Sequence, residues 1–178
     1  MNRRLSSTSR LAVIALAYFS VFQVAHSNEV AISGGEGSDA RVYGVQFVAS
    51  PALWSKKFSD KWQGSLRVEA SIGNVEGRGS GGSNSIIVGA SPMLRLTMVD
   101  SPLYAEVGIG VNYFDNKRIN ASKEMGTHFQ FGDMLGVGVR LTAEQVHLGY
   151  RFIHYSNAGI SSSNPGLDLH MLSLKVSF

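Results

Sequence analysis

Apolar and polar side chains alternate along most of this chain. In one segment, residues 65–75, the apolar Leu66, Val68, Ala70 and Ile72 alternate with Arg67, Glu69, Ser71 and Gly73. A period of two predicts a β-strand with one apolar and one polar face. The same pattern recurs, and we predict eight strands at 29–34, 41–49, 65–75, 85–96, 103–113, 129–141, 145–156 and 168–178.

The contents of the polar faces indicate how the strands are arranged. These faces carry glycine and charges of both signs, including Arg67, Glu69, Arg95, Glu106, Arg140 and Arg151. Most predicted strands have about the 9–11 residues that a tilted membrane-spanning strand needs. We therefore predict an all-β, eight-stranded antiparallel up-and-down transmembrane barrel with these charges inside. A soluble, lipocalin-like barrel would invert the faces and is the alternative.

Three features favour the membrane barrel. The chain ends in an aromatic residue, Phe178, after an alternating strand. An even number of strands allows the closure that lipid requires. Predicted connections also segregate by length, with 99–102 and 142–144 short and 114–128 and 157–167 long. The long connection 50–64 is an exception, where Trp54, Phe58 and Trp62 recur at helical spacing and predict an interfacial aromatic anchor or an ordinary turn.

The N-terminal segment has the pattern of a secretory signal peptide. Arg3, Arg4 and Arg10 precede an apolar run at 11–24 and an Ala-His-Ser sequence ending at Ser27. The apolar run is shorter than the roughly 20 residues of a membrane-spanning helix. We predict that residues 1–27 are cleaved after export and that 28–178 form one barrel domain in the outer membrane of a Gram-negative cell.

Charge and cysteine content exclude several function classes. The net charge of +3 comes from three arginines at positions 1–27, so residues 28–178 are balanced and indicate no nucleic-acid partner. The sequence has no cysteine, which excludes a disulfide framework and a thiol nucleophile. The histidines lack close ligand spacing, so we expect no metal site, and the chemistry considered below implies no cofactor.

The most informative stretch is 151–170, RFIHYSNAGISSSNPGLDLH. His154 and Ser156 share one face of a predicted strand, turn-forming residues follow, and Asp168 begins the last strand on the same otherwise apolar face. A serine becomes nucleophilic when a histidine takes its proton and a carboxylate orients that histidine. Taken singly, His154 is more simply explained as an interface histidine, Ser156 as a loop-entry hydroxyl and Asp168 as an ordinary turn acid. Exposing all three polar side chains on a lipid-facing surface costs free energy, so their presence together favours a functional role.

The sequences HYSNAG and NPGLD resemble the active-site hairpin of the PagL-type lipid A 3-O-deacylases of the bacterial outer membrane. This resemblance implies an eight-stranded barrel with His154 as base, Ser156 as nucleophile and Asp168 as acid, where family members carry Glu. It also suggests Asn164, with backbone N–H groups near Gly159, for stabilising an oxyanion.

The expected activity is hydrolysis of the acyl ester at the 3-position of lipid A of lipopolysaccharide. A groove lined by Leu148, Tyr150 and Phe152 would accept acyl chains from the outer-membrane lipid. Two alternatives are an outer-membrane phospholipase or acyltransferase using the same triad, and a non-enzymatic structural or adhesive barrel. The sequence leaves open whether two barrels pair as a homodimer.

Three further titratable residues lie near these elements. Asp133 falls on the apolar face of the predicted strand 129–141, beside the strand of His154, and either supports the site or lies near lipid headgroups. His170 shares the face of Asp168 and is either an adjusting group or a boundary histidine. His147 should face the barrel interior and have a structural role.

Overall fold

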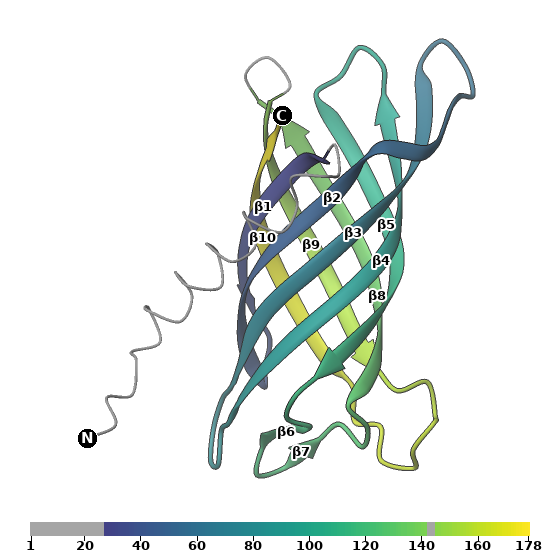
Figure 1. Ribbon diagram of the computed structural model, residues 1–178. Coiled ribbons are helices and arrows are strands. Elements are labelled where there is room, and N and C mark those ends of the chain that lie inside the picture. Colours follow the sequence, from purple (N-terminus) through teal and green to yellow (C-terminus); the bar gives the residue numbers. More distant parts are fainter. Residues whose placement is uncertain (1–26, 142–144) are drawn as a thin grey trace.

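Eight antiparallel strands close into a barrel in the computed structural model, which describes residues 27–141 and 145–178 (Figure 1). The predicted fold class is confirmed, whereas the expected signal peptide lies outside the described residues except for Ser27. The barrel strands are β1 Ser27–Glu36, β2 Ala40–Lys57, β3 Trp62–Gly77, β4 Asn84–Met98, β5 Leu103–Phe114, β8 Phe129–Arg140, β9 Val146–Ser156 and β10 Leu167–Ser177.

The strands follow an up-and-down order. Each barrel strand pairs with the next along the chain, and β1 pairs with β10, so that the sheet order is β1-β10-β9-β8-β5-β4-β3-β2. The observed bounds agree with the predicted ones to within a few residues, except at the end of β2. This strand continues to Lys57 instead of ending at Ala49. Among the described residues, no helix is long and apolar enough to cross a membrane.

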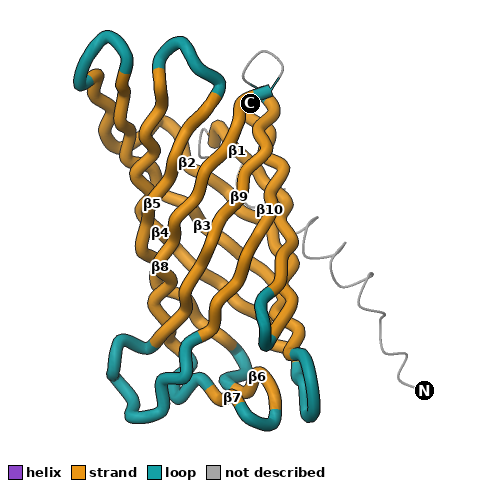
Figure 2. Tube along the Cα trace, turned by 180° about the vertical axis from the view of Figure 1, so that it is seen from behind, coloured by secondary structure: helices purple, strands orange, loops and turns teal. Residues whose placement is uncertain are grey.

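The two ends of the barrel differ. Figures 1 and 2 show the connections 37–39, 78–83, 115–128 and 157–166 at one end, which we name the loop end. The connection 115–128 contains a small hairpin of β6 Arg118–Asn120 and β7 Lys123–Glu124. The opposite end, named the turn end, carries the turns 58–61 and 99–102 and the C-terminus. The predicted segregation of long and short connections is confirmed for 99–102, 115–128 and 157–166, whereas 37–39 is a short connection at the loop end. The predicted short connection 142–144 lies outside the described residues.

The segment 50–64 is mostly strand, so its prediction as a long connection was wrong. The β2–β3 register shifts between Ala49 and Trp54, after which Trp54 pairs with Leu66 and Lys57 with Gln63. The extra residues of such a bulge change which side chains face outward, and this breaks the simple alternation. Only 58–61 connect the two strands, and the exposed aromatic side chains lie at the turn end on strands and turn.

The outside of the barrel is apolar. Large hydrophobic side chains are exposed on almost every strand, including Ile86, Val107, Val111, Leu135, Val137, Leu148, Leu172 and Val176. In a water-soluble barrel these would fill the interior. Exposed apolar side chains over polar inward faces are the arrangement of a transmembrane β-barrel, and the lipocalin-like alternative is therefore wrong.

The half of the interior nearer the turn end is a connected network of ion pairs. The predicted inward orientation is confirmed for Arg67, Glu69, Arg95, Glu106 and Arg151, and Glu29 and Lys175 join them. Strands distant in sequence are linked in this way across the lumen. The pairs, at 2.5–3.4 Å, are Arg67–Glu29, Arg95–Glu29, Arg95–Glu106, Lys175–Glu106, Arg151–Glu106 and Arg151–Glu69. Arg140 donates to the carbonyl oxygen of Ser101 at 2.6 Å.

Towards the loop end the interior becomes apolar. The sequence gives apolar residues on both faces there, as in Ile86 and Ile87, so one of each pair must point inward. Side chains of the loop residues Ile119 and Met125 complete this cluster. Its other members are Ala40, Val42, Val75, Ile87, Met93, Phe114, Met134, Ile153, Tyr155, Leu167, Leu169 and Met171.

Glu106 is the centre of the charged network, because it contacts Arg95, Arg151 and Lys175. Glu106→Gln keeps the shape but leaves buried cations without their shared anion. We expect the free energy of unfolding to fall by about 3–5 kcal/mol, the usual cost of breaking a buried ion pair. Urea titration in lipid vesicles, followed by heat-modifiable gel mobility, measures this change.

Glu36→Gln is the matched control. Glu36 pairs with Arg41 and Arg78, but its side chain is 60% exposed, so water already screens the pairs. Exposed ion pairs contribute about 0–1 kcal/mol. Equal losses of stability in the two variants would contradict a special role for the interior network.

Candidate active site

The pairing of β9 with β10 places a histidine and a carboxylate side by side on the outer surface. His154 lies directly opposite Asp168 in the register, and its Nδ1 is 2.6 Å from Asp168 Oδ1. The side chains are 40% and 59% exposed, respectively. Because the residues are exact cross-strand neighbours, even the short side chain of an aspartate reaches the imidazole.

This hydrogen bond also determines what the imidazole can do. The Asp168 carboxylate is an acceptor, so it favours the tautomer in which Nδ1 of His154 carries the proton. The lone pair of Nε2 is then free to accept a proton. Ser156 is two residues further along the same strand and on the same face, about 6.6–7 Å away along the backbone. The structure thus brings the three predicted residues to one surface.

A second carboxylate lies on the other side of His154. Asp133 of β8 pairs with His154 in the register, and its side chain is exposed on the same outer face. The imidazole is therefore between carboxylates on two neighbouring strands. The hydrogen bond to Asp168 distinguishes the two and supports Asp168 as the orienting acid.

Asn157, next to Ser156, organises the β9–β10 loop. Its side chain is fully buried, and its Nδ2 donates to the carbonyl oxygens of Met125 and Ser163 at 3.2 and 2.8 Å. Its Oδ1 accepts from the backbone N–H groups of Gly159 and Ser161 at 3.0 and 3.4 Å. One amide side chain therefore ties the loop to itself and to the 115–128 connection.

The two groups predicted to stabilise an oxyanion differ in whether their N–H donors are already engaged. The Gly159 N–H donates to Asn157 Oδ1, so it is engaged within the loop. Asn164 Oδ1 accepts the backbone N–H of Asn157 at 2.9 Å, which fixes the orientation of its amide. Asn164 is exposed, and its Nδ2 group is a potential hydrogen-bond donor.

Gly166 forms a wall behind the histidine. Its backbone has a φ of 66°, a left-handed conformation that favours glycine. A Cβ at this position would lie 2.9 Å from Cε1 of His154, closer than ordinary van der Waals contact. A larger residue here would strain the left-handed backbone and push against the imidazole.

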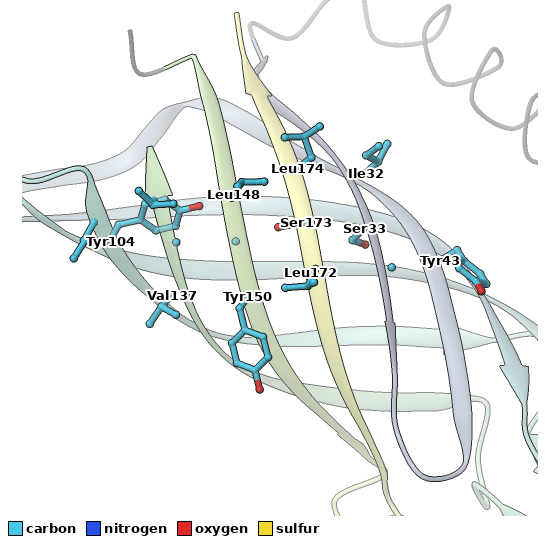
Figure 3. A pocket seen from close by; sticks show the side chains of 15 residues that line it. Ile32, Ser33, Tyr43, Tyr104, Val137, Leu148, Tyr150, Leu172, Ser173 and Leu174 are labelled. Atoms are coloured by element: carbon cyan, nitrogen blue, oxygen red, sulfur yellow. The ribbon is translucent and has the colours of Figure 1, made fainter. Parts of the chain in front are cut away.

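Two apolar hollows on the outer surface separate the predicted groove residues. Leu148 and Tyr150 line a hollow of about 970 Å³ that also includes Leu172 and Leu174 of β10 (Figure 3). Phe152 instead lines a second hollow of about 600 Å³, which we name the His154 hollow because that residue forms part of its wall. Its other lining residues are Leu66, Pro92, Leu94, Val107, Gly108, Ile109, Asp133, Met134 and Leu135.

Two further histidines, His170 and His147, have separate surroundings. His170 is 2.7 Å from the Tyr150 hydroxyl through Nδ1 and contacts the Phe152 ring, so it lies beside the site without joining the pair. His147 is buried at the turn-end side of the interior, as predicted. Within 27–141 and 145–178, no three His, Asp or Glu side chains are grouped to hold a metal ion.

Known protein families provide a comparison for the whole barrel. A sequence model of the family described as Lipid A 3-O-deacylase (PagL) matches residues 41–177. The chain belongs to the PagL family. The resemblance seen in HYSNAG and NPGLD is therefore confirmed, and it extends over most of the barrel.

Individual relatives show the same relationship. The lipid A deacylase PagL of Bordetella bronchiseptica is 36% identical over 132 residues, which is 72% of each chain. The lipid A deacylase PagL of Pseudomonas aeruginosa is 36% identical over 73 residues, 41% of each chain. A crystal structure of the outer membrane enzyme PagL superposes with a TM-score of 0.74 at 22% identity, covering 84% of this chain and 99% of that one, and so has the same PagL fold.

Sequence reasoning did not identify the residues that support the PagL site. Asn157 and Gly166 lie within the quoted motifs, where their turn-forming character was the only signal. The contact of the loop with Met125 joins residues 32 positions apart and has no local signature.

Asn157→Ala should loosen the β9–β10 loop of this PagL-family chain. The change leaves the carbonyl and N–H groups around Asn157 without partners, each costing about 1–3 kcal/mol when buried. We expect faster cleavage within 157–166 by proteinase K, detected by mass spectrometry of the folded protein. Ser162→Ala, at an exposed position in the same loop, is the control. Equal cleavage rates in the two variants would show that Asn157 does not order the loop.

Proposed function

We propose that this chain is a lipid A 3-O-deacylase of the outer membrane, an ester hydrolase that uses Ser156, His154 and Asp168. Family membership supports the substrate and the bond cleaved. The observation that carries the assignment of residues is the 2.6 Å contact between His154 Nδ1 and Asp168 Oδ1 on a lipid-facing surface. A polar pair at such a place is costly unless it has a function.

In the first step, Ser156 Oγ attacks the carbonyl carbon of the acyl ester. His154 Nε2 accepts the serine proton, and the Asp168 carboxylate stabilises the imidazolium that forms. The tetrahedral intermediate collapses when its bond to the sugar oxygen breaks. His154 returns the proton to that oxygen, leaving the sugar hydroxyl free and the acyl group on Ser156.

In the second step, water replaces the sugar. His154 takes a proton from the water, and the resulting hydroxide attacks the acyl carbonyl. The bond to Ser156 Oγ then breaks, with the proton passing to this oxygen, and the fatty acid is released. No cofactor is required for either step.

We assign the stabilisation of the oxyanion to the side-chain amide of Asn164. Its Oδ1 is held by the Asn157 backbone, and its Nδ2 is the donor that can meet a charged oxygen near Ser156. The Gly159 N–H would first have to leave Asn157 Oδ1, so we give it no part in the resting geometry.

The depth of the site suits a lipid substrate. His154, Ser156 and Asp168 lie near the loop end of β9 and β10, the end that faces outward in barrels of this class. The ester bonds of an outer-leaflet lipid are at the membrane surface, where this end of the barrel would meet them. The ester can therefore reach Ser156 sideways, without leaving the bilayer.

The His154 hollow is the better place for the acyl chain. It begins at the imidazole and continues over the apolar side chains of β8, β5 and β4. The hollow that contains Leu148 and Tyr150 includes none of the three triad residues in its lining. An acyl chain attached at Ser156 would thus run past Phe152 and Leu135.

Ser156→Ala should abolish the activity, and Asp168→Asn should lower it strongly. Without the serine no acyl-enzyme forms, and we expect a loss of about 10³-fold or more. An amide at position 168 no longer stabilises the imidazolium, which should cost about 10²–10⁴-fold. Mass spectra of lipid A from outer membranes expressing each variant at matched levels measure the loss of one acyl chain.

Asp133→Asn is the matched control for the acid, since Asp133 lies across from His154 on the other strand. Asp133→Asn should lose much less activity than Asp168→Asn, because Asp133 lines the His154 hollow but is not part of the proposed triad. A larger loss with Asp133→Asn than with Asp168→Asn would assign the acid to β8. Turnover of phospholipid with unchanged lipid A would instead favour the phospholipase alternative.

Leu94→Trp tests the position of the acyl chain. A larger side chain would fill the His154 hollow from β4 while the outer face stays apolar. We expect kcat/KM for long acyl esters to fall about tenfold and that for short esters to change little, since pocket contacts are worth about 1–3 kcal/mol. Leu148→Trp fills the other hollow and should have no such effect. The reverse result would move the chain to that hollow.

A further inference from the structure

The β6–β7 hairpin lies across the loop end of the barrel (Figures 1 and 2). It is firmly attached there, because Ile119 and Met125 are fully buried. Ile119 O also accepts the N–H of Ser83 at 3.0 Å from the β3–β4 connection. The hairpin is therefore part of the folded barrel end and can hold other segments in place.

One lysine of this hairpin joins three connections. Lys123 Nζ donates to the carbonyl oxygen of Gly166, in the β9–β10 loop, at 2.9 Å. The same ammonium is 2.8 Å from Asp39 Oδ2, in the β1–β2 connection. The Lys123 side chain is only 17% exposed, so this arrangement is partly shielded from water.

Asp39 supplies the counter-charge that keeps Lys123 in this place. The hydrogen bond from Lys123 lowers the pKa of Asp39 below its ordinary value, so the carboxylate stays charged. Asp39 also accepts the Ser38 hydroxyl at 2.6 Å, which limits its own motion. The ammonium is thus directed to Gly166 by a partner that is itself fixed.

Gly166 is in turn the residue that touches the histidine. Its left-handed backbone passes so close to His154 that there is no room for a Cβ beside the ring. Asp168 follows two residues later in the same segment. A displacement of Gly166 would therefore change the wall behind the imidazole and the position of the acid together.

We propose that Lys123 is a positioning residue for the site: by holding the Gly166 carbonyl, it keeps the 166–168 segment against His154. Asp39 is its orienting partner. This inference rests on the proposed function of Ser156 and His154. Neither Lys123 nor Asp39 contacts the substrate or the reacting atoms in this role, and the effect is transmitted through the backbone.

The test measures the reactivity of the serine without lipid A. A fluorophosphonate reacts with a serine that a histidine activates, so its labelling rate reports the Ser156–His154 pair. We expect Lys123→Met, which keeps the side-chain stem but removes the ammonium, to label about 10–100-fold more slowly, since small misplacements of reacting groups cost about 10²-fold. The kcat for lipid A should fall in parallel, with KM changing less than about twofold.

Two further variants separate positioning from general loop stability. Lys123→Arg retains a donor and a positive charge and should recover the labelling rate to within about threefold of wild type. Lys117→Met removes an ion pair to Glu124 and a donor to Gly126 O from the same connection, without touching Gly166, and should label as wild type. Labelling is scored on the heat-modifiable folded band alone, so a poorly folding variant still gives a rate.

The outcomes distinguish this inference from the function on which it rests. Equal labelling of wild type and Lys123→Met, with Ser156→Ala unlabelled, would overturn the positioning role and leave the triad intact. Absence of serine-specific labelling in wild type would overturn the triad and this inference with it. Asp39→Asn leaves the lysine in place, and slower labelling of that variant as well would confirm that the ion pair orients it.

Discussion

The pairing of β1 with β10 closes the sheet, and the other features of this protein depend on that closure. It runs from Glu29 opposite Ser177 to Glu36 opposite His170. In hydrocarbon, a backbone N–H or C=O without a partner costs several kcal/mol, so an open edge is not tolerated. Closure also fixes which face looks outward. An interior of eight strands is only wide enough for side chains, and the charges there must therefore pair with one another.

This filled interior has a consequence for where chemistry can occur. With Glu29, Arg95, Glu106 and Arg151 joined across the lumen, there is little room for a substrate inside. Reactive groups must then be on the outside or at an end. A lipid substrate approaches from the side, and the outer surface near the loop end is the place where it meets polar groups. The ion pairs in the interior thus hold the strands together, and the candidate site lies on the outer surface of these strands.

The sequence predicted the strands well because one physical rule, alternation between lipid and interior, applies along most of the chain. It failed at 50–64, where a bulge changes the parity and aromatic residues of a strand pair happen to repeat at helical spacing. The candidate site could be located in the sequence because His154 and Ser156 are local neighbours and the motif is specific. The supporting contacts could not, because Lys123 and Gly166 are 43 residues apart and are brought together only by the fold.

Strand register and loop contacts therefore control different properties of the His154–Asp168 pair. The register sets the separation, because exact cross-strand neighbours bring even the short aspartate within hydrogen-bonding distance. It does not set the angle of an imidazole that is 40% exposed on a smooth outer surface. That orientation needs a wall, and Gly166 provides one only while its own carbonyl is held. The strands of a barrel can thus position catalytic side chains, but contacts from the loops are needed to orient them.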